Sequence, residues 1–219
     1  MYGWLYENCP RVRFVLKTTS DIFINLPKVD QLVEQEMFAA NRMYGELLKR
    51  MQANRDPAAD KDGQHFVSKK DWPWDHFPPF LKGPSYIVSG DLIPRILMAS
   101  TVIPTLPLPQ IFFTGLVPLM GHMMRIGVAS FFAYYPPEKD SKDPCDFSKF
   151  GGIHNMAGDL ELMEIAMNKV EEALVRNVTC EAGPRCLAMV EGKCMWFSRD
   201  EKKKRKKTVA QKWAKRKRK

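Results

Sequence analysis

A single acidic residue in a polar loop is the first position in this sequence where chemistry could take place. Asp21 follows Thr19 and Ser20, and their loop joins the apolar runs 12–16 and 22–24. Both runs have the composition of short buried strands, so the acid is held between two strand ends. Judged from composition alone, such an acid most often caps a turn. A ligand role for Asp21 therefore depends on the residues around it.

A second cluster of interest is aromatic. Residues 72–80 contain two tryptophans, two phenylalanines and three prolines, which is too much proline for a regular element. We predict a rigid loop there. Flat aromatic rings can cover the faces of pyranose sugars, which makes Trp72, Trp74, Phe77 and Phe80 candidates for contact with a sugar. Core packing is the more common role of such rings, and both interpretations stay open.

The cysteine pattern is more informative about the cellular compartment than about a metal site. Five cysteines stand at positions 9, 145, 180, 186 and 194, and the Cys-x5-Cys-x7-Cys spacing of the last three fits no zinc pattern. We favour a secreted fold with one or two disulfides and one unpaired thiol, with a reduced cytosolic protein as the alternative. The triplet that begins at Asn177 is a candidate N-glycosylation site and favours the secretory alternative.

Positive charge is concentrated at one end of the chain. The formal net charge is +9, but residues 202–219 alone carry twelve lysines or arginines and no acid. The remainder is mildly acidic, so we expect no nucleic-acid binding by the folded part. We predict one domain over residues 1–200, followed by a basic, disordered tail over residues 201–219. Nuclear import through this tail is an alternative to a secretory location.

Hydrophobic periodicity predicts strands that alternate with helices, which is typical of an α/β fold. Strands are expected at 12–16, 22–24, 65–68 and 85–88. Helices are expected at 28–38, 91–100, 111–124 and 159–175, with Asp91 as a possible N-cap of the second. Helical spacing also recurs at Met43, Leu47, Leu48 and Met51.

Residues 96–124 carry no formal charge and are numerous enough to suggest a membrane span. Four prolines interrupt this stretch, and a lipid-exposed helix tolerates that density poorly. We therefore predict buried core helices and loops. The methionines at helical positions are expected in the core as well: Met98, Met120, Met123, Met124, Met163 and Met167.

Four landmarks in order resemble the beta-1,3-galactosyltransferase family of hexosyltransferases, glycosyltransferase family 31. Residues 8–25 resemble the family's strand and metal-binding loop, and Phe66-Val67-Ser68 resembles the end of a second strand. Residues 77–86, with Phe77-Pro78-Pro79-Phe80, Gly83 and Tyr86, resemble its Tyr-Pro-Pro-Tyr/Phe-Cys-x-Gly-x-Gly-Tyr segment. Cys145, followed nine residues later by His154, resembles the closing region.

The resemblance implies a GT-A type α/β domain, a mixed sheet with flanking helices. It implies transfer of galactose or N-acetylhexosamine from a UDP-sugar donor to a glycan hydroxyl, in the Golgi lumen behind a membrane anchor upstream of this chain. In such sites Mn²⁺ joins a loop carboxylate to the diphosphate, and a separate carboxylate takes the acceptor proton. Carried over, Asp21 and His154 are metal ligands, and Thr19 and Ser20 are donor-binding residues.

This sequence departs from the family pattern in several places. Thr19 stands where the loop's first acid is expected, and Pro109-Gln110 stands where an acidic pair is expected, so neither can act as a general base. Asp75 and Asp91 are substitute candidates for the base. Leu81 replaces a cysteine, which is expected to leave Cys9 or Cys145 free. Since Met1 lies only eight residues before Cys9, the chain resembles the second half of a family domain, and we expect an exposed sheet edge.

Three hypotheses follow for the function. The first is a Golgi hexosyltransferase that uses a UDP-sugar with Mn²⁺. The second is a catalytically inactive relative that keeps the fold as a glycan-binding or chaperone-like module, because three expected acids are missing. The third is a nuclear or nucleic-acid-associated protein directed by the basic tail.

Overall fold

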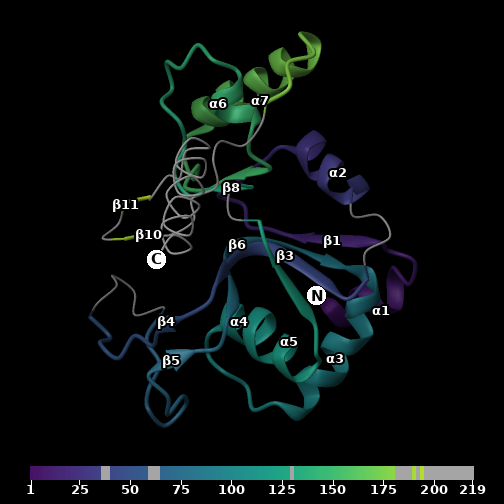
Figure 1. Cartoon of the computed structure of the whole chain (residues 1–219), viewed down its shortest axis with the longest axis vertical. Coiled ribbons are helices and arrows are strands. Elements are labelled where there is room, and N and C mark those ends of the chain that lie inside the picture. Colours follow the sequence, from purple (N-terminus) through teal and green to yellow (C-terminus); the bar gives the residue numbers. More distant parts are fainter. Residues whose placement is uncertain (36–39, 59–64, 129–130, 181–188, 191–192, 195–219) are drawn as a thin grey trace, which may run out of the picture. The chain divides into compact units, whose positions relative to one another are not determined.

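The structure is a computed structural model that describes residues 1–35, 40–58, 65–128, 131–180, 189–190 and 193–194 (Figure 1). It divides into two units, Met1–Cys180 and Glu181–Lys219. In the second unit the described residues form two antiparallel strands, β10 (Met189–Val190) and β11 (Lys193–Cys194). The predicted basic tail lies outside the described residues.

The first unit is built around a mixed four-stranded sheet. Its strand order is β1 (Phe14–Lys17), β6 (Phe80–Ser89), β3 (Arg42–Leu48) and β7 (Met124–Gly127). β6 is antiparallel to both of its neighbours, whereas β3 and β7 are parallel. The predicted α/β class with a mixed sheet is confirmed.

Helices cover one face of this sheet and complete its core (Figure 1). They are α1 (Tyr2–Asn8), the 3-10 turn η1 (Gly90–Leu92), α3 (Ile93–Val102), α4 (Pro109–Ile111), the π-helix η2 (Phe112–Leu116) and α5 (Val117–Met120). Pro109 begins α4 and with it the helical stretch 109–120, where a missing N–H costs no hydrogen bond. Prolines also lie near the starts of α3 and α5, which continue directly from η1 and η2. The sheet and these helices are called the large region below.

A smaller region carries the rest of the first unit. Its sheet has the order β2 (Phe23–Ile24), β9 (Gly152–Ile153) and β8 (Phe132–Ala133), with α6 (Cys145–Ser148) and α7 (Leu160–Val175) packed beside it. Asp159 caps α7, since its carboxylate accepts a hydrogen bond from the backbone N–H of Leu162 at 3.0 Å. This small region has its own core: Ala133, Phe147, Ile153, Met156, Leu162 and Ala166.

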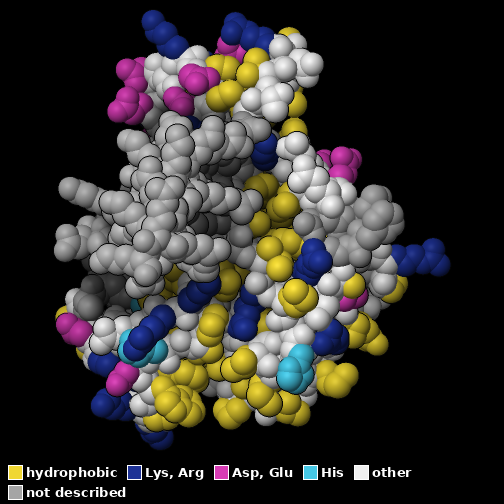
Figure 2. Space-filling view, viewed as in Figure 1, with side chains coloured by type: hydrophobic (Ala, Val, Ile, Leu, Met, Phe, Trp, Pro, Cys, Tyr) yellow, Lys and Arg dark blue, Asp and Glu magenta, His cyan; other side chains and the backbone are white. Residues whose placement is uncertain are grey.

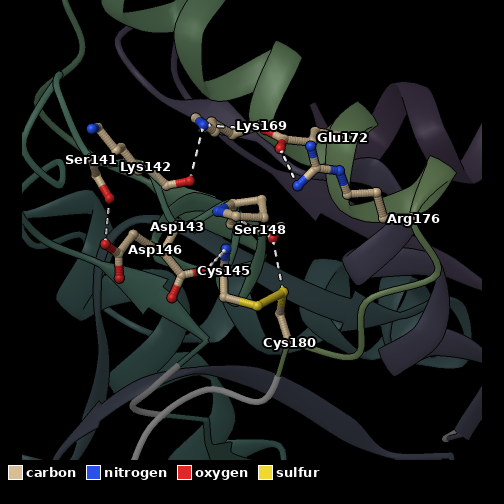
Figure 3. A network of polar contacts seen from close by, with 11 residues as sticks. Ser141, Lys142, Asp143, Cys145, Asp146, Ser148, Lys169, Glu172, Arg176 and Cys180 are labelled. Carbon is tan, nitrogen blue, oxygen red and sulfur yellow. Dashed lines mark hydrogen bonds and ion pairs between the residues drawn. A yellow bond between two sulfur atoms is a disulfide. The ribbon is translucent and has the colours of Figure 1, made fainter.

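A disulfide and a polar network join the two ends of the small region (Figure 3). Cys145 at the start of α6 is bonded to Cys180, which follows α7. Ser148 donates a hydrogen bond to the sulfur of Cys180 at 3.2 Å, and Lys28 donates to the carbonyl of Cys180 at 3.0 Å. One expected disulfide is thus present, and Cys9, not Cys145, is the free thiol among the described cysteine side chains.

Two further elements complete the first unit. The helix α2 (Leu26–Gln35) covers the sheet near Tyr44 and Ile87 through Val29. The short strands β4 (Met51–Gln52) and β5 (His76–Phe77) pair antiparallel beside the aromatic segment. No helix within the described residues combines the length and apolar composition that crossing a membrane would require.

Several sequence predictions of elements are wrong, and the reasons are physical. The helical spacing at Met43 to Met51 belongs to β3 and β4, because β3 lies between two strands with Met43 and Tyr44 both buried. A strand buried on both faces lacks the alternation that identifies strands. Residues 65–68 form one isolated bridge, between Asn54 and Phe66. Asp91 caps no helix; it lies inside η1 and accepts from the backbone N–H of Asn41.

The buried side of α7 agrees only in part with the helical spacing of its apolar residues. Val170 is buried as that spacing predicts, whereas Leu160, Met167 and Leu174 are exposed, and the buried side is completed by Leu162, Ala166 and Ala173. Of the six methionines expected in the core, Met123 is buried and Met163 packs at the edge of the small core. Figure 2 shows hydrophobic side chains on the surface at the bottom of the view, where Figure 1 places α3 and α5. The exposed methionines there and on other elements are Met98, Met120, Met124 and Met167.

Candidate functional site

A cavity of about 460 Å³ collects several of the residues singled out from the sequence, among them Asp21, His154, Phe77 and Phe80. Its lining comes from the Asp21 loop, β6, α4, and the segments that follow β8 and β9. Segments more than 100 residues apart in the chain therefore meet at one place. The described lining residues are Asp21, Met51, His65, Phe77, Phe80, Lys82, Gly83, Pro84, Leu108, Pro109, Gln110, Ile111, Tyr134, His154 and Asn155.

Asp21 is held in the cavity wall by its backbone and its neighbour. The loop joins β1 of the large sheet to β2 of the small one, and the carbonyl of Asp21 accepts from the backbone N–H of Met156 at 3.0 Å. The hydroxyl of Thr19 donates to the Asp21 carboxylate. Thr19 and Ser20 are exposed and lie outside the cavity lining. Thr19 therefore orients the acid, and the predicted contact of Thr19 and Ser20 with a donor stays a prediction.

Lys17 adds a nearby positive charge. Its ammonium donates to the carbonyl of Pro84 at 2.9 Å, and its strand leads directly into the Asp21 loop. Burial lowers the pKa of Lys17, and the negative charge of Asp21 opposes that shift. Lys17 is thus a cationic neighbour of the Asp21 carboxylate.

His154 is the clearest unsatisfied group of the cavity. It follows β9 and is only 5% exposed, and neither ring nitrogen has a hydrogen-bond partner. Burial lowers the pKa of His154 below its usual 6.5; Asp21 opposes this shift, and Lys82 adds to it. The imidazole is therefore neutral near pH 7, with a lone pair available. A buried polar group without a partner costs free energy, which indicates that a ligand is meant to satisfy it.

Gly83 permits the close approach of β6 to this histidine. A side-chain carbon at Gly83 would lie 3.1 Å from Cε1 of His154, and the φ of Gly83 is +91°, a conformation that other residues rarely adopt. Gly83 is one of the motif residues quoted above. The conformation of the backbone and the position of the imidazole thus explain why glycine is suited to this place.

The part of the cavity wall formed by α4 carries no acid where the resemblance led us to expect one. Pro109 and Gln110 begin α4, and both line the cavity. The buried hydroxyl of Thr114 ties this helix to β6, since it lies 3.0 Å from the backbone N–H of Leu81 and 2.6 Å from the carbonyl of Gln110. Position 110 therefore faces the cavity, but with an amide that cannot take a proton.

The other two candidates for the general base lie elsewhere. Asp91 accepts from the backbone N–H of Asn41 and lines a different cavity, near Cys9. Asp75 is exposed, and neither acid belongs to the described lining of the cavity at Asp21. The structure thus brings neither substitute base to the candidate site.

The four rings of the aromatic segment have different surroundings. Phe77 and Phe80 are buried and contribute an apolar floor to the cavity. Trp72 stacks on Phe77 with ring centroids 5.6 Å apart and packs against the core. Trp74 is 63% exposed and touches Trp72 edge-on at 4.6 Å. Core packing thus accounts for three of the four rings, and only Trp74 presents an open face to solvent.

The candidate glycosylation site lies apart from the cavity. Asn177 follows α7 with a φ of +51°. Its side chain is exposed, so its amide is accessible from solvent.

Several residues of the cavity lining were missed by the sequence analysis: Lys82, Tyr134, Asn155 and His65. Lys82 occupies a variable position of the quoted motif, and Tyr134 and Asn155 lie in segments without a motif. Only the pairing of β3, β6, β8 and β9 brings them together.

Two described residues fit a divalent cation. A carboxylate at Asp21 and a neutral, unpaired imidazole at His154 are the donor types that Mn²⁺ accepts, and they share one cavity. Within the described residues, no three His, Cys, Asp or Glu side chains gather into a fuller set. The described residues of the cavity would thus supply two ligands, and oxygens of an anionic substrate could add to them.

Comparisons with known proteins point to one family. A model of the galactosyltransferase family matches residues 1–120. Human beta-1,3-galactosyltransferase 5 is 36% identical over 109 residues, which cover 50% of this chain and 34% of that protein. Human beta-1,3-galactosyltransferase 4 is 30% identical over 135 residues, covering 50% of this chain and 36% of that protein.

A more distant relative extends the match along the chain. Lactosylceramide 1,3-N-acetyl-beta-D-glucosaminyltransferase B of Xenopus laevis is 22% identical over 186 residues, covering 82% of this chain and 48% of that protein. The chain thus spans between a third and a half of the length of the curated relatives that it matches.

Proposed function

This chain belongs to the galactosyltransferase family, and from that membership and its cavity we propose that it is a hexosyltransferase using a UDP-sugar donor. Galactose or an N-acetylhexosamine would be moved to a hydroxyl of a glycan acceptor. The observation that carries the proposal is the convergence of Asp21, Lys82 and His154 on one cavity floored by Phe77 and Phe80. A cavity with these polar groups and an apolar floor suits a charged donor that bears a sugar.

In this proposal each side chain has a defined task. Asp21, oriented by Thr19, and His154, kept neutral by burial, would hold Mn²⁺, which when bound neutralises negative charge on the diphosphate leaving group. Phe77 and Phe80 exclude water from the floor of the cavity. The metal is a proposal that rests on the donor set alone.

The proton of the acceptor hydroxyl needs a base other than residues 109 and 110. Among the described lining residues, Asp21, His65 and His154 have side chains of the types that act as general bases. Since Asp21 and His154 are assigned to the metal, His65 is the base in this proposal. Substitution of His65 by Asn should lower kcat of transfer while the KM for the donor stays within about twofold.

The test of the proposed function is a transfer assay on the full chain. Radiolabelled UDP-galactose and UDP-N-acetylhexosamines are offered with a panel of glycan acceptors, with Mn²⁺ or with EDTA. We expect turnover with Mn²⁺ that falls at least about a hundredfold in Asp21→Asn. Asp30→Asn, an exposed acid on α2, is the matched control and should retain activity. Absence of turnover of every donor in the wild-type chain contradicts the proposal.

A second function is favoured by the missing acids. Thr19, Pro109 and Gln110 stand where the resemblance implies carboxylates, and the last two line the cavity. A relative that binds glycans or nucleotide sugars without turnover would have this arrangement. The combined variant Thr19→Asp, Pro109→Glu and Gln110→Asp distinguishes an active transferase from an inactive binding module. Activity that arises only in this variant supports the inactive binding module, and activity of the wild type excludes it.

The location that fits this function is the Golgi lumen, with attachment to the membrane through a segment outside the present sequence. The disulfide between Cys145 and Cys180 is of the kind formed in the secretory pathway. Exposed Asn177 would then carry an N-glycan. We expect endoglycosidase treatment to reduce the apparent mass of the secreted or Golgi-retained chain, and Asn177→Gln to abolish that shift. A nuclear chain that never shows the shift contradicts this location.

A further inference from the structure

The lysine of the cavity is held in place from two sides. Lys82 lies opposite Glu46 in the register of β3 and β6, and its ammonium is 4.0 Å from the Glu46 carboxylate. On the other side, the ammonium lies 4.3 Å from the ring centroid of Tyr134, an attractive cation–π distance. The side chain of Lys82 keeps 37% of its surface exposed. The charge is therefore oriented but not enclosed, and it remains available to a ligand.

The same ring connects Lys82 to the unsatisfied histidine. The rings of Tyr134 and His154 are 6.0 Å apart, and both residues line the cavity with Lys82. His154 is buried and neither of its nitrogens has a hydrogen-bond partner. A positive charge beside an unpaired imidazole N–H is an arrangement that satisfies an anion, because both groups can donate to its oxygens.

The described lining carries one acid and one lysine, Asp21 and Lys82. Asp21 has Lys17 nearby and accepts a hydrogen bond from the Thr19 hydroxyl, while Lys82 has the Glu46 carboxylate at 4.0 Å. Since threonine replaces an acid in that loop, a cation would be bound there more weakly than by two carboxylates. A protein that binds a diphosphate in this cavity therefore needs positive charge from its own side chains.

We infer that Lys82 and the N–H of His154 form an anion subsite that binds the diphosphate of the nucleotide sugar, while the lone-pair nitrogen of His154 is the one proposed above for Mn²⁺. Lys82 then supplies charge that a metal would otherwise supply alone. This inference rests on the proposed function and adds one residue to it. Its consequence is that UDP remains bound, although more weakly, when divalent cations are removed. Lys82 is thus a binding residue for the donor, whereas Tyr134 and Glu46 position its ammonium.

The test compares three lysine variants of the full chain by isothermal titration calorimetry. In EDTA, we expect Lys82→Gln to weaken UDP binding at least about tenfold, which corresponds to the loss of one charged hydrogen bond. Lys82→Arg should stay within about threefold of the wild type, because it retains the charge. Lys69→Gln, an exposed lysine outside the cavity lining, is the matched control and should bind as the wild type does.

Two further probes make the result specific. Uridine, which lacks phosphates, should bind the wild type and Lys82→Gln equally, and inorganic pyrophosphate should lose affinity in Lys82→Gln as UDP does. Equal UDP affinity of the wild type and Lys82→Gln overturns the subsite even if sugar transfer is observed. If pyrophosphate binds in a manner that depends on Lys82 but UDP does not bind, the anion subsite is supported and its assignment to the diphosphate of a nucleotide sugar is contradicted. Absence of binding of both ligands by the wild type in EDTA overturns the anion subsite, whereas the proposed function is contradicted only by absence of turnover in the transfer assay with Mn²⁺.

Discussion

The two walls of the cavity are stabilised in different ways. The wall from the large region rests on an extended apolar core in which Leu81, Leu92, Ile96 and Val117 are fully buried. The wall from the small region rests on six buried residues, with short strands, a helix cap and a disulfide in addition. A small core rarely supplies enough stability alone, so the disulfide and the helix cap contribute a larger share of the stability of the small region. The small region, which has the smaller apolar core, thus carries His154, Tyr134 and Asn155.

The largest expected effect comes from opening the small core. Phe147 is fully buried there, and Phe147→Ala should cost about 3–5 kcal/mol of unfolding free energy. Because the small region has few other apolar contacts, we expect hydrogen exchange to lose protection in β8, β9 and α7 while β3 and β6 stay protected. Equal loss of protection in both sheets contradicts the proposed division of the two regions.

Removal of the disulfide should have a slightly smaller effect in the same place. The bridge spans a sequence separation of 35 residues, and replacing both Cys145 and Cys180 by Ala should cost about 2–4 kcal/mol. We expect a lower denaturation midpoint for the transition that reports on α7, measured by hydrogen exchange in urea. Cys9→Ala is the matched control because its thiol is free, and it should leave that midpoint unchanged.

In the large region, a polar link can be removed without opening a cavity. Thr114→Val keeps the volume of the side chain but leaves the buried backbone N–H of Leu81 without its partner, at a cost of about 1–3 kcal/mol. Thermal unfolding measures this loss. We expect the exchange protection of the small region to be unaffected, and a selective loss of protection in α7 would contradict the independence of the two regions.

The smallest expected effect concerns the cap of α7 and its dependence on pH. Hydrogen bonds from Lys139 and from the backbone N–H of Leu162 lower the pKa of Asp159 below its usual 3.8. The carboxylate therefore stabilises the fold above pH 3.8, and this contribution is lost as the pH falls through the lowered value. We expect Asp159→Asn to reduce the acid-induced decrease in Tm. An identical acid profile for wild type and variant contradicts this role.

The same contrast explains how much could be predicted from the sequence. α2, α3 and α7 were predicted because amphipathic periodicity is a local signal. β3 was not, because a strand buried on both faces has no alternation, and the buried side of α7 was predicted only in part. Asp21 and His154 were found through motif resemblance. Lys82 and Tyr134 were missed, because their meeting depends on the pairing of distant strands.

The most direct test of the central claim is a crystal structure of the full chain soaked with UDP and MnCl₂. The account predicts electron density for the diphosphate in the cavity, within hydrogen-bond distance of Lys82 and His154, with an anomalous manganese peak beside Asp21. Density for UDP at another place, with the cavity between β6 and β9 left without ligand at saturating UDP, would contradict the account.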